Sequence, residues 1–91
     1  MHEAAAHVVI KGRVQGVGYR FFALDAANIH RLKGWVRNVP DGDVECVVEG
    51  PRPSIDDFLE ALRKGPSMAR VDAVHISWKH PTFHFSEFSI R

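Results

Sequence analysis

Cysteine is almost absent from this sequence, since Cys46 is the only one. A single thiol cannot form an internal disulfide, and it cannot supply a thiolate cluster for zinc. The chain also lacks the ~20 consecutive apolar residues that a membrane-spanning helix needs, and its N-terminus has no small-residue cleavage pattern. These absences favour a protein that is neither exported nor inserted in a membrane. We therefore expect a cytoplasmic location, where thiols stay reduced.

A charge excess of one sign is missing as well, because the formal net charge is only +1. The distribution is less even. Residues 1–40 carry six Lys or Arg against two Asp or Glu, whereas residues 41–60 carry seven acidic residues against a single Arg. A protein that binds a polyanion normally has a strongly basic surface. We therefore expect a local site for a small anion in the first half, and neither a nucleic acid nor a membrane as a partner.

With 91 residues, the chain has room for one hydrophobic core, so residues 1–91 are predicted as a single domain with residues 1–6 as a flexible tail. Apolar periodicity and turn residues predict seven elements. The second helix has the clearest signals, because Ser54 and Asp57 fit a capping box and Gly65-Pro66 ends its apolar stripe. The predicted elements are strands at 7–14, 35–39, 43–49, 70–79 and 85–90, and helices at 19–32 and 54–64.

The order β-α-β-β-α-β-β is typical of an α+β fold of the ferredoxin-like type, a split β-α-β sandwich. We expect an antiparallel sheet with both helices on one face. The first two strands then run the same way with the third between them, so their C-terminal ends share one edge of the sheet, roughly 10 Å apart. Alternation along the third strand predicts that Cys46 faces inward, while Glu45 and Glu49 face outward.

The segment from Gly12 to Arg20, GRVQGVGYR, is the strongest candidate for a binding loop. Gly16 and Gly18 allow a turn whose N–H groups form an anion-binding nest, and the N-terminus of the following helix adds partial positive charge. Arg20 can hold a phosphoryl group with two parallel hydrogen bonds. The alternative is a glycine turn beside an ordinary surface arginine. The loop has no Cys, Ser or Thr nucleophile and no His or acid, so it offers no candidate for covalent catalysis.

Two motifs make the sequence similar to a known family. GRVQGVGYR, which ends on Arg20, is followed by GWVRN, which ends on Asn38, and together they resemble the paired motifs of the acylphosphatase family. The similarity continues in VECVVEGP at 44–51, in KGP at 64–66, in ARV at 69–71 and in the phenylalanine-rich C-terminal strand. It therefore covers nearly the whole chain. Two motifs with matching flanks are far more specific than a single Gly-x-Gly.

The resemblance implies a reaction and a role for individual residues. The reaction is the hydrolysis of acyl phosphates, which are carboxylic–phosphoric mixed anhydrides, to carboxylate and phosphate. It needs no metal, no cofactor and no covalent intermediate. Arg20 would bind the phosphoryl oxygens, and Asn38 would orient the attacking water. The loop residues whose N–H groups would bind substrate with Arg20 are Gln15, Gly16, Val17, Gly18 and Tyr19. Nothing in the sequence requires more than a monomer.

Two other functions fit parts of the sequence. One is a non-catalytic or accessory anion-binding module, like the similar domain fused to carbamoyltransferases that mature hydrogenases. The other, an RNA-binding sandwich, ranks last because the third strand has valines and acids where exposed aromatic residues are needed. The six histidines are scattered, so we expect no metal site. Arg31 stands where the family commonly has glycine, and it is mildly strained if that position has a positive φ.

Overall fold

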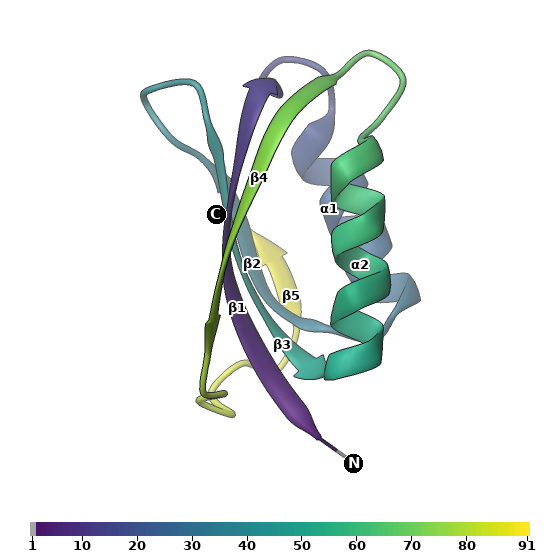
Figure 1. Ribbon diagram of the computed structural model, residues 1–91, viewed down its shortest axis with the longest axis vertical. Helices are drawn as coiled ribbons and strands as arrows, with labels where there is room; N and C mark the ends of the chain where they lie inside the picture. Colours follow the sequence, from purple (N-terminus) through teal and green to yellow (C-terminus); the bar gives the residue numbers. More distant parts are fainter. Residues whose placement is uncertain (1) are drawn as a thin grey trace.

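The computed structural model describes residues 2–91, and Met1 lies outside the described residues. One five-stranded sheet forms the first layer, and two α-helices pack on the same face of it as the second layer (Figure 1). This is the α+β, ferredoxin-like arrangement that the sequence predicts. The elements in chain order are β1 (Glu3–Arg13), α1 (Tyr19–Ile29), β2 (Lys33–Asn38), β3 (Val44–Pro51), α2 (Arg52–Lys64), β4 (Arg70–Lys79) and β5 (Phe88–Ile90).

The strand order across the sheet is β4-β1-β3-β2-β5. Since β3 pairs antiparallel with both β1 and β2, these two strands run the same way and end at one edge, as predicted. β5 is parallel to β2, so the sheet is mixed and the prediction of a fully antiparallel sheet is wrong. The connection explains the difference. After β4 on one side, residues 80–87 carry the chain across to the other side, whereas a hairpin would have turned it back.

The N-terminal residues belong to the sheet. Residues 1–6 are predicted as a flexible tail, but Glu3 to Ala6 begin β1 and pair with residues 48–51 of β3. Ala5 and Ala6 are buried. A run of three alanines has no alternation of polar and apolar side chains. The alternation that predicts the strand therefore begins only after these alanines, although the strand itself begins before them. The prediction of a tail is therefore wrong for residues 3–6.

The start of α2 differs from the predicted one. The helix begins at Arg52, and its N-cap is Pro51, with no side-chain hydrogen bond to the first turn. The capping box of Ser54 and Asp57 is therefore wrong. Pro53 explains the earlier start, because proline lacks an N–H and fits the first turn, where that group would have no helical partner. The buried face of α2 is the predicted one, made of Ile55, Phe58, Leu59 and Leu62.

The end of α1 carries backbone strain. The helix begins at Tyr19, as predicted, but ends at Ile29, before the predicted limit at Leu32. The chain leaves it through Arg31, whose φ of 57° lies in the left-handed region. Such a conformation favours glycine, because a Cβ crowds the following carbonyl. The strain that the sequence predicts for an arginine at this position is therefore present.

Tyr19 joins the two helices at the end of the core nearest the β1–α1 loop. Its ring is buried, and its hydroxyl donates a hydrogen bond of 2.6 Å to the carbonyl of Leu62 in the last turn of α2. This bond fixes the start of α1 against the end of α2. Cys46 is fully buried, as predicted, and burial raises the pKa of its thiol, so it packs as a small inert side chain.

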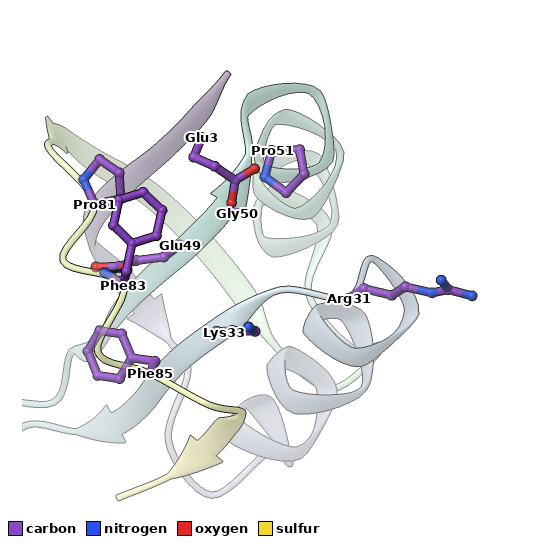
Figure 2. A pocket seen from close by; sticks show the side chains of 9 residues that line it. All are labelled: Glu3, Arg31, Lys33, Glu49, Gly50, Pro51, Pro81, Phe83 and Phe85. Carbon is purple, nitrogen blue, oxygen red and sulfur yellow. Dashed lines mark hydrogen bonds between the residues drawn. The ribbon is translucent and has the colours of Figure 1, made fainter. Parts of the chain in front are cut away.

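Glu49 anchors the segment that crosses from β4 to β5. It lies on the outward face of β3, as predicted, yet it is buried because residues 80–87 cover it. Its carboxylate accepts hydrogen bonds from the N–H groups of Thr82 and Phe83 and from the Thr82 hydroxyl, all between 2.9 and 3.0 Å. Figure 2 shows this carboxylate beside Pro81 and Phe83, at the wall of a cavity of about 250 Å³. This cavity lies at the end of the sheet where β1 and β2 begin.

Replacing Arg31 with glycine is expected to stabilise the protein. Glycine adopts a positive φ without the Cβ penalty, so the strain in the folded state is removed. This gain exceeds the entropic cost of the more flexible unfolded chain by roughly 0.5–1 kcal/mol. Urea unfolding should show a higher midpoint with an unchanged slope. The matched control is Arg63→Gly on the exposed side of α2, where glycine should cost about 1 kcal/mol. An Arg31→Gly midpoint at or below that of the wild type would contradict the assignment of strain.

Candidate active site

The loop between β1 and α1 lies at the edge of the sheet where β1 and β2 end (Figure 1). Gly16 and Gly18 have φ values of 73° and 78°, both in the left-handed region that favours glycine. A Cβ at either position would meet no atom within 4 Å, so the turn itself, and not close packing, requires glycine. Gly18 is the N-cap of α1, and no acidic residue occupies the first turn. The first N–H groups of the helix therefore keep their partial positive charge.

A cavity of about 100 Å³ lies between this loop and the end of β2. It brings together Arg20, from the first turn of α1, and Asn38, the last residue of β2. Gln15 and Val17 do not line it. The other lining residues are Val14, Gly16, Gly18, Tyr19 and Phe21. Because a single water needs roughly 10–15 Å³ of such volume, the cavity has room for a small anion and a water.

The guanidinium of Arg20 is free to bind a ligand. Arg20 is half-buried, and within residues 2–91 it forms no ion pair. By contrast, the Nε of Arg37 donates to Glu45 at 2.6 Å, and that of Arg70 donates to Asp72 at 2.9 Å. The cavity has no acidic side chain in its wall. The charge of Arg20 is therefore available to an anion in the cavity.

Asn38 contributes a buried polar atom without a partner. Its side-chain oxygen Oδ1 is closed off from solvent and accepts no hydrogen bond from residues 2–91. A buried acceptor left unsatisfied costs roughly 1–3 kcal/mol, and native proteins rarely leave one so. Asn38 also lines the cavity, and a turn of its amide would bring the Oδ1 to a bound water or ligand there. Asn38 therefore brings a side-chain amide to the same cavity as Arg20.

Gln15 reaches the site through a contact that the sequence does not indicate. Its side-chain Nε2 donates to the carbonyl of Val39 at 2.7 Å and to that of Asp43 at 2.9 Å. Both carbonyls belong to the connection between β2 and β3, and Val39 directly follows Asn38. The two hydrogen bonds therefore tie the loop to the end of β2. The resemblance implies only the backbone N–H of Gln15, so this positioning role was missed.

Tyr19 lines the cavity, but its hydroxyl forms a hydrogen bond outside the cavity. The hydroxyl is bound to the Leu62 carbonyl, and burial raises the pKa of the phenol well above its ordinary value. Proton transfer by this group near neutral pH is therefore disfavoured. Any contribution of Tyr19 to anion binding comes from its backbone, which is the role that the resemblance implies.

Val14 and Phe21 line the cavity but are absent from the predicted site. Val14 is buried in the core, whereas Phe21 is 64% exposed. Phe21 directly follows Arg20 and lies off the buried face of α1, which consists of Tyr19, Ala23, Ala26 and Ala27. A helical projection of residues 19–29 would have shown an apolar side chain with no place in the core. Motif comparison gave no signal for it.

A second groove, of about 500 Å³, borders Asn38 on the outward side of the sheet. The guanidinium carbons of Arg37 and Arg91 lie 5.6 and 4.9 Å from the ring centroid of Trp35. The hydrogen bond with His7, and after it the hydrogen bond and charge of Arg37, hold the pKa of the Glu45 carboxyl below its usual value. The charged groups of this groove are thus largely engaged with one another.

Two further properties concern residues 2–91 as a whole. No three His, Cys, Asp or Glu side chains in this part of the chain come together in a group that could hold a metal ion. The two helices of this part are also too short and too polar to span a membrane.

Comparison with known proteins identifies the family of this chain. The family model for acylphosphatases matches residues 6–90. The acylphosphatase of Chloroflexus aurantiacus is 46% identical over 85 residues, which cover 93% of this chain and 92% of that protein. The acylphosphatase of a Roseiflexus species is 47% identical over 90 residues, which cover 99% of this chain and 97% of that protein.

The fold gives the same result. The crystal structure of the acylphosphatase from Bacillus subtilis superposes with a TM-score of 0.94 at 34% identity, over 97% of this chain and 98% of that one. Sequence and fold thus both match acylphosphatases over nearly their full length. The expectation from the paired motifs is confirmed, and the chain belongs to the acylphosphatase family.

Proposed function

We propose that this acylphosphatase holds the phosphoryl group of its substrate with Arg20 and directs a water to it with Asn38. The reaction of the family is the hydrolysis of an acyl phosphate to a carboxylate and inorganic phosphate. The observation that carries the two roles is the shared cavity, which both residues line: the Arg20 guanidinium forms no ion pair within residues 2–91, and the Asn38 Oδ1 has no hydrogen-bond partner there. The backbone N–H groups of residues 15–19 join Arg20 in binding.

Complementary charge binds the phosphoryl group. Its oxygens accept two parallel hydrogen bonds from Arg20 and others from the loop and the N-terminus of α1. The transition state of phosphoryl transfer is loose, with negative charge spread over three oxygens, so positioning and electrostatic stabilisation supply most of the catalysis. The cavity contains no acidic side chain that would oppose this charge.

The attacking water is held by the Oδ1 of Asn38, which accepts one of its hydrogens. The water oxygen forms a new bond to phosphorus while the bond from phosphorus to the acyl oxygen breaks, and the electron pair leaves with the carboxylate. Asparagine is not a base, so the water's proton passes to a phosphoryl oxygen of the substrate. A carboxylate leaves readily, and the scheme therefore needs no general acid.

Neither a covalent intermediate nor a metal takes part in this scheme. The one hydroxyl among the cavity residues is the phenol of Tyr19, which is bound to Leu62. Arg20 and the helix N-terminus supply the positive charge that a metal provides in other phosphoryl-transfer enzymes. We also propose that a single chain acts on this small substrate in the cytoplasm, because Arg20 and Asn38 of the same chain line one cavity and the lone thiol of Cys46 suits a compartment where thiols stay reduced.

Arg20→Gln and Asn38→Ala are each expected to lower kcat/KM by ~10²–10³, the usual effect of losing one well-placed donor or orienting group. Hydrolysis of benzoyl phosphate, measured by ultraviolet absorbance in EDTA, tests both. Arg20→Gln should also raise the inhibition constant for inorganic phosphate, because the phosphoryl-binding charge is gone. Asn38→Ala should act mainly on kcat, since it removes the acceptor of the water and leaves the anion contacts in place.

The matched controls for this assay are Arg63→Gln and Asn28→Ala, which change exposed helix residues outside the cavity and should keep wild-type activity. Asn38→Asp is a sharper test of orientation, because it keeps the shape but adds a negative charge that repels the phosphoryl group. An active Asn38→Asp enzyme would count against the orienting role. A folded wild type that binds phosphate without hydrolysing acyl phosphates would favour the anion-binding module.

Gln15→Ala is expected to lower kcat/KM by about tenfold, because the loop loses its tie to the end of β2 and small misplacements of reacting groups are costly. Gln15→Glu should be worse, since it turns a carboxylate toward the carbonyls of Val39 and Asp43. Steady-state kinetics beside urea unfolding separates a local effect from a loss of stability. Wild-type kinetics in Gln15→Ala would show that these hydrogen bonds do not position the site.

A further inference from the structure

The acyl half of the substrate needs a place beside the phosphoryl cavity. We propose that the exposed ring of Phe21 is this place and makes the enzyme favour acyl phosphates with an aromatic or long aliphatic acyl group. The proposal rests on the roles proposed for Arg20 and Asn38. Its starting point is that Phe21, although 64% exposed, lines the same cavity as these two residues.

The direction of the reaction places the acyl group on the side of Phe21. In a phosphoryl transfer, the attacking and leaving oxygens lie roughly in line across the phosphorus atom. Asn38 is the last residue of β2, so the water approaches from the sheet. The acyl group therefore points away from the sheet, toward the first turn of α1, where Phe21 lies.

The groove around Trp35 does not fit the acyl group, although it is larger. It borders Asn38 on the outward side of the sheet, which is the side of the water. Its guanidinium groups lie against the Trp35 ring, and Arg37 is also paired with Glu45. An acyl group there would have to leave from the face on which the water attacks.

No other part of the fold uses the Phe21 ring. Its neighbours Tyr19 and Phe22 pack together with ring centroids 6.1 Å apart, but within residues 2–91 Phe21 belongs neither to an aromatic pair nor to the core. A single exposed apolar residue is ordinary, so its location carries the argument. The other large apolar side chains that are similarly exposed all lie outside this cavity: Ile29, Met68, Trp78 and Phe83.

The lining of the cavity selects the class of acyl group. Arg20 is its only charged side chain, and the phosphoryl group uses that charge. A second anionic group on the acyl chain would find no second cation here. A phenyl ring, by contrast, gains an offset or edge-on contact with Phe21 and leaves water. Arg20 thus binds the phosphoryl group, and Phe21, the next residue in the chain, contacts the acyl group.

Phe21→Ala tests the proposal with two substrates that share a phosphoryl group, benzoyl phosphate and acetyl phosphate. The ratio of kcat/KM for benzoyl phosphate to that for acetyl phosphate should fall about fivefold to tenfold, mainly through KM, because an aromatic contact made before the chemical step is lost. Phe21→Tyr keeps the ring and should restore the ratio. The inhibition constant for inorganic phosphate should stay within about twofold of the wild type, because phosphate makes no use of the ring.

The matched control is Phe83→Ala, which removes a ring of similar exposure, 71%, at the other end of the sheet and should keep the wild-type ratio. An unchanged ratio in Phe21→Ala overturns the proposal, and so does an equal loss for both substrates or a weaker binding of phosphate. A failure of the proposed catalytic roles gives a different result. In that case the Arg20→Gln and Asn38→Ala enzymes would remain active on both substrates. A wild type that hydrolyses neither substrate overturns both proposals.

Discussion

The pairing of β3 with β1 on one side and β2 on the other is the constraint on which the site depends. Both pairings are antiparallel, so the outer two strands of this trio run the same way and end together. Arg20 comes just after the loop that follows the end of β1, and Asn38 is the last residue of β2. The strand between them sets the gap at two strand spacings, roughly 10 Å. The side chains of Gln15 and Tyr19 then hold the loop to the turn after β2 and to α2.

The site keeps polar groups without partners in the folded protein. The Arg20 guanidinium has no acid beside it, and the Oδ1 of Asn38 is buried without a donor within residues 2–91. The buried Oδ1 of Asn38 lowers the stability of the fold, and proteins retain such groups chiefly where function needs them. A ligand that gave the Oδ1 a hydrogen-bond donor would remove this cost. The buried ring of Tyr19 and the core beneath the loop offset this loss.

The sequence predicted the parts of the molecule that follow local rules. The helix face of Ile55 to Leu62, the alternation around Cys46 and the placement of Arg20 near Asn38 all follow from periodicity and strand order. The parallel β5 was missed because the crossover of residues 80–87 has no local signature, and Glu3 to Ala6 were missed because alanines do not alternate in polarity. The contacts of Gln15 and the position of Phe21 depend on residues brought together only by the fold. The site assignment from the motifs remains a prediction until the variants are measured.

The central position of β1 has a consequence for how the chain folds. β1 is made first during synthesis, yet its partners come late, since Ala5 pairs with Glu49 on one side and with Lys79 on the other. One edge of β1 has no partner until β3 (Val44–Pro51) is made, and the other has none until β4 (Arg70–Lys79). Contacts so distant in sequence impose a high contact order, which slows folding relative to helical proteins of similar size. The strand that leads into the β1–α1 loop therefore gains its second partner only once β4 has been made.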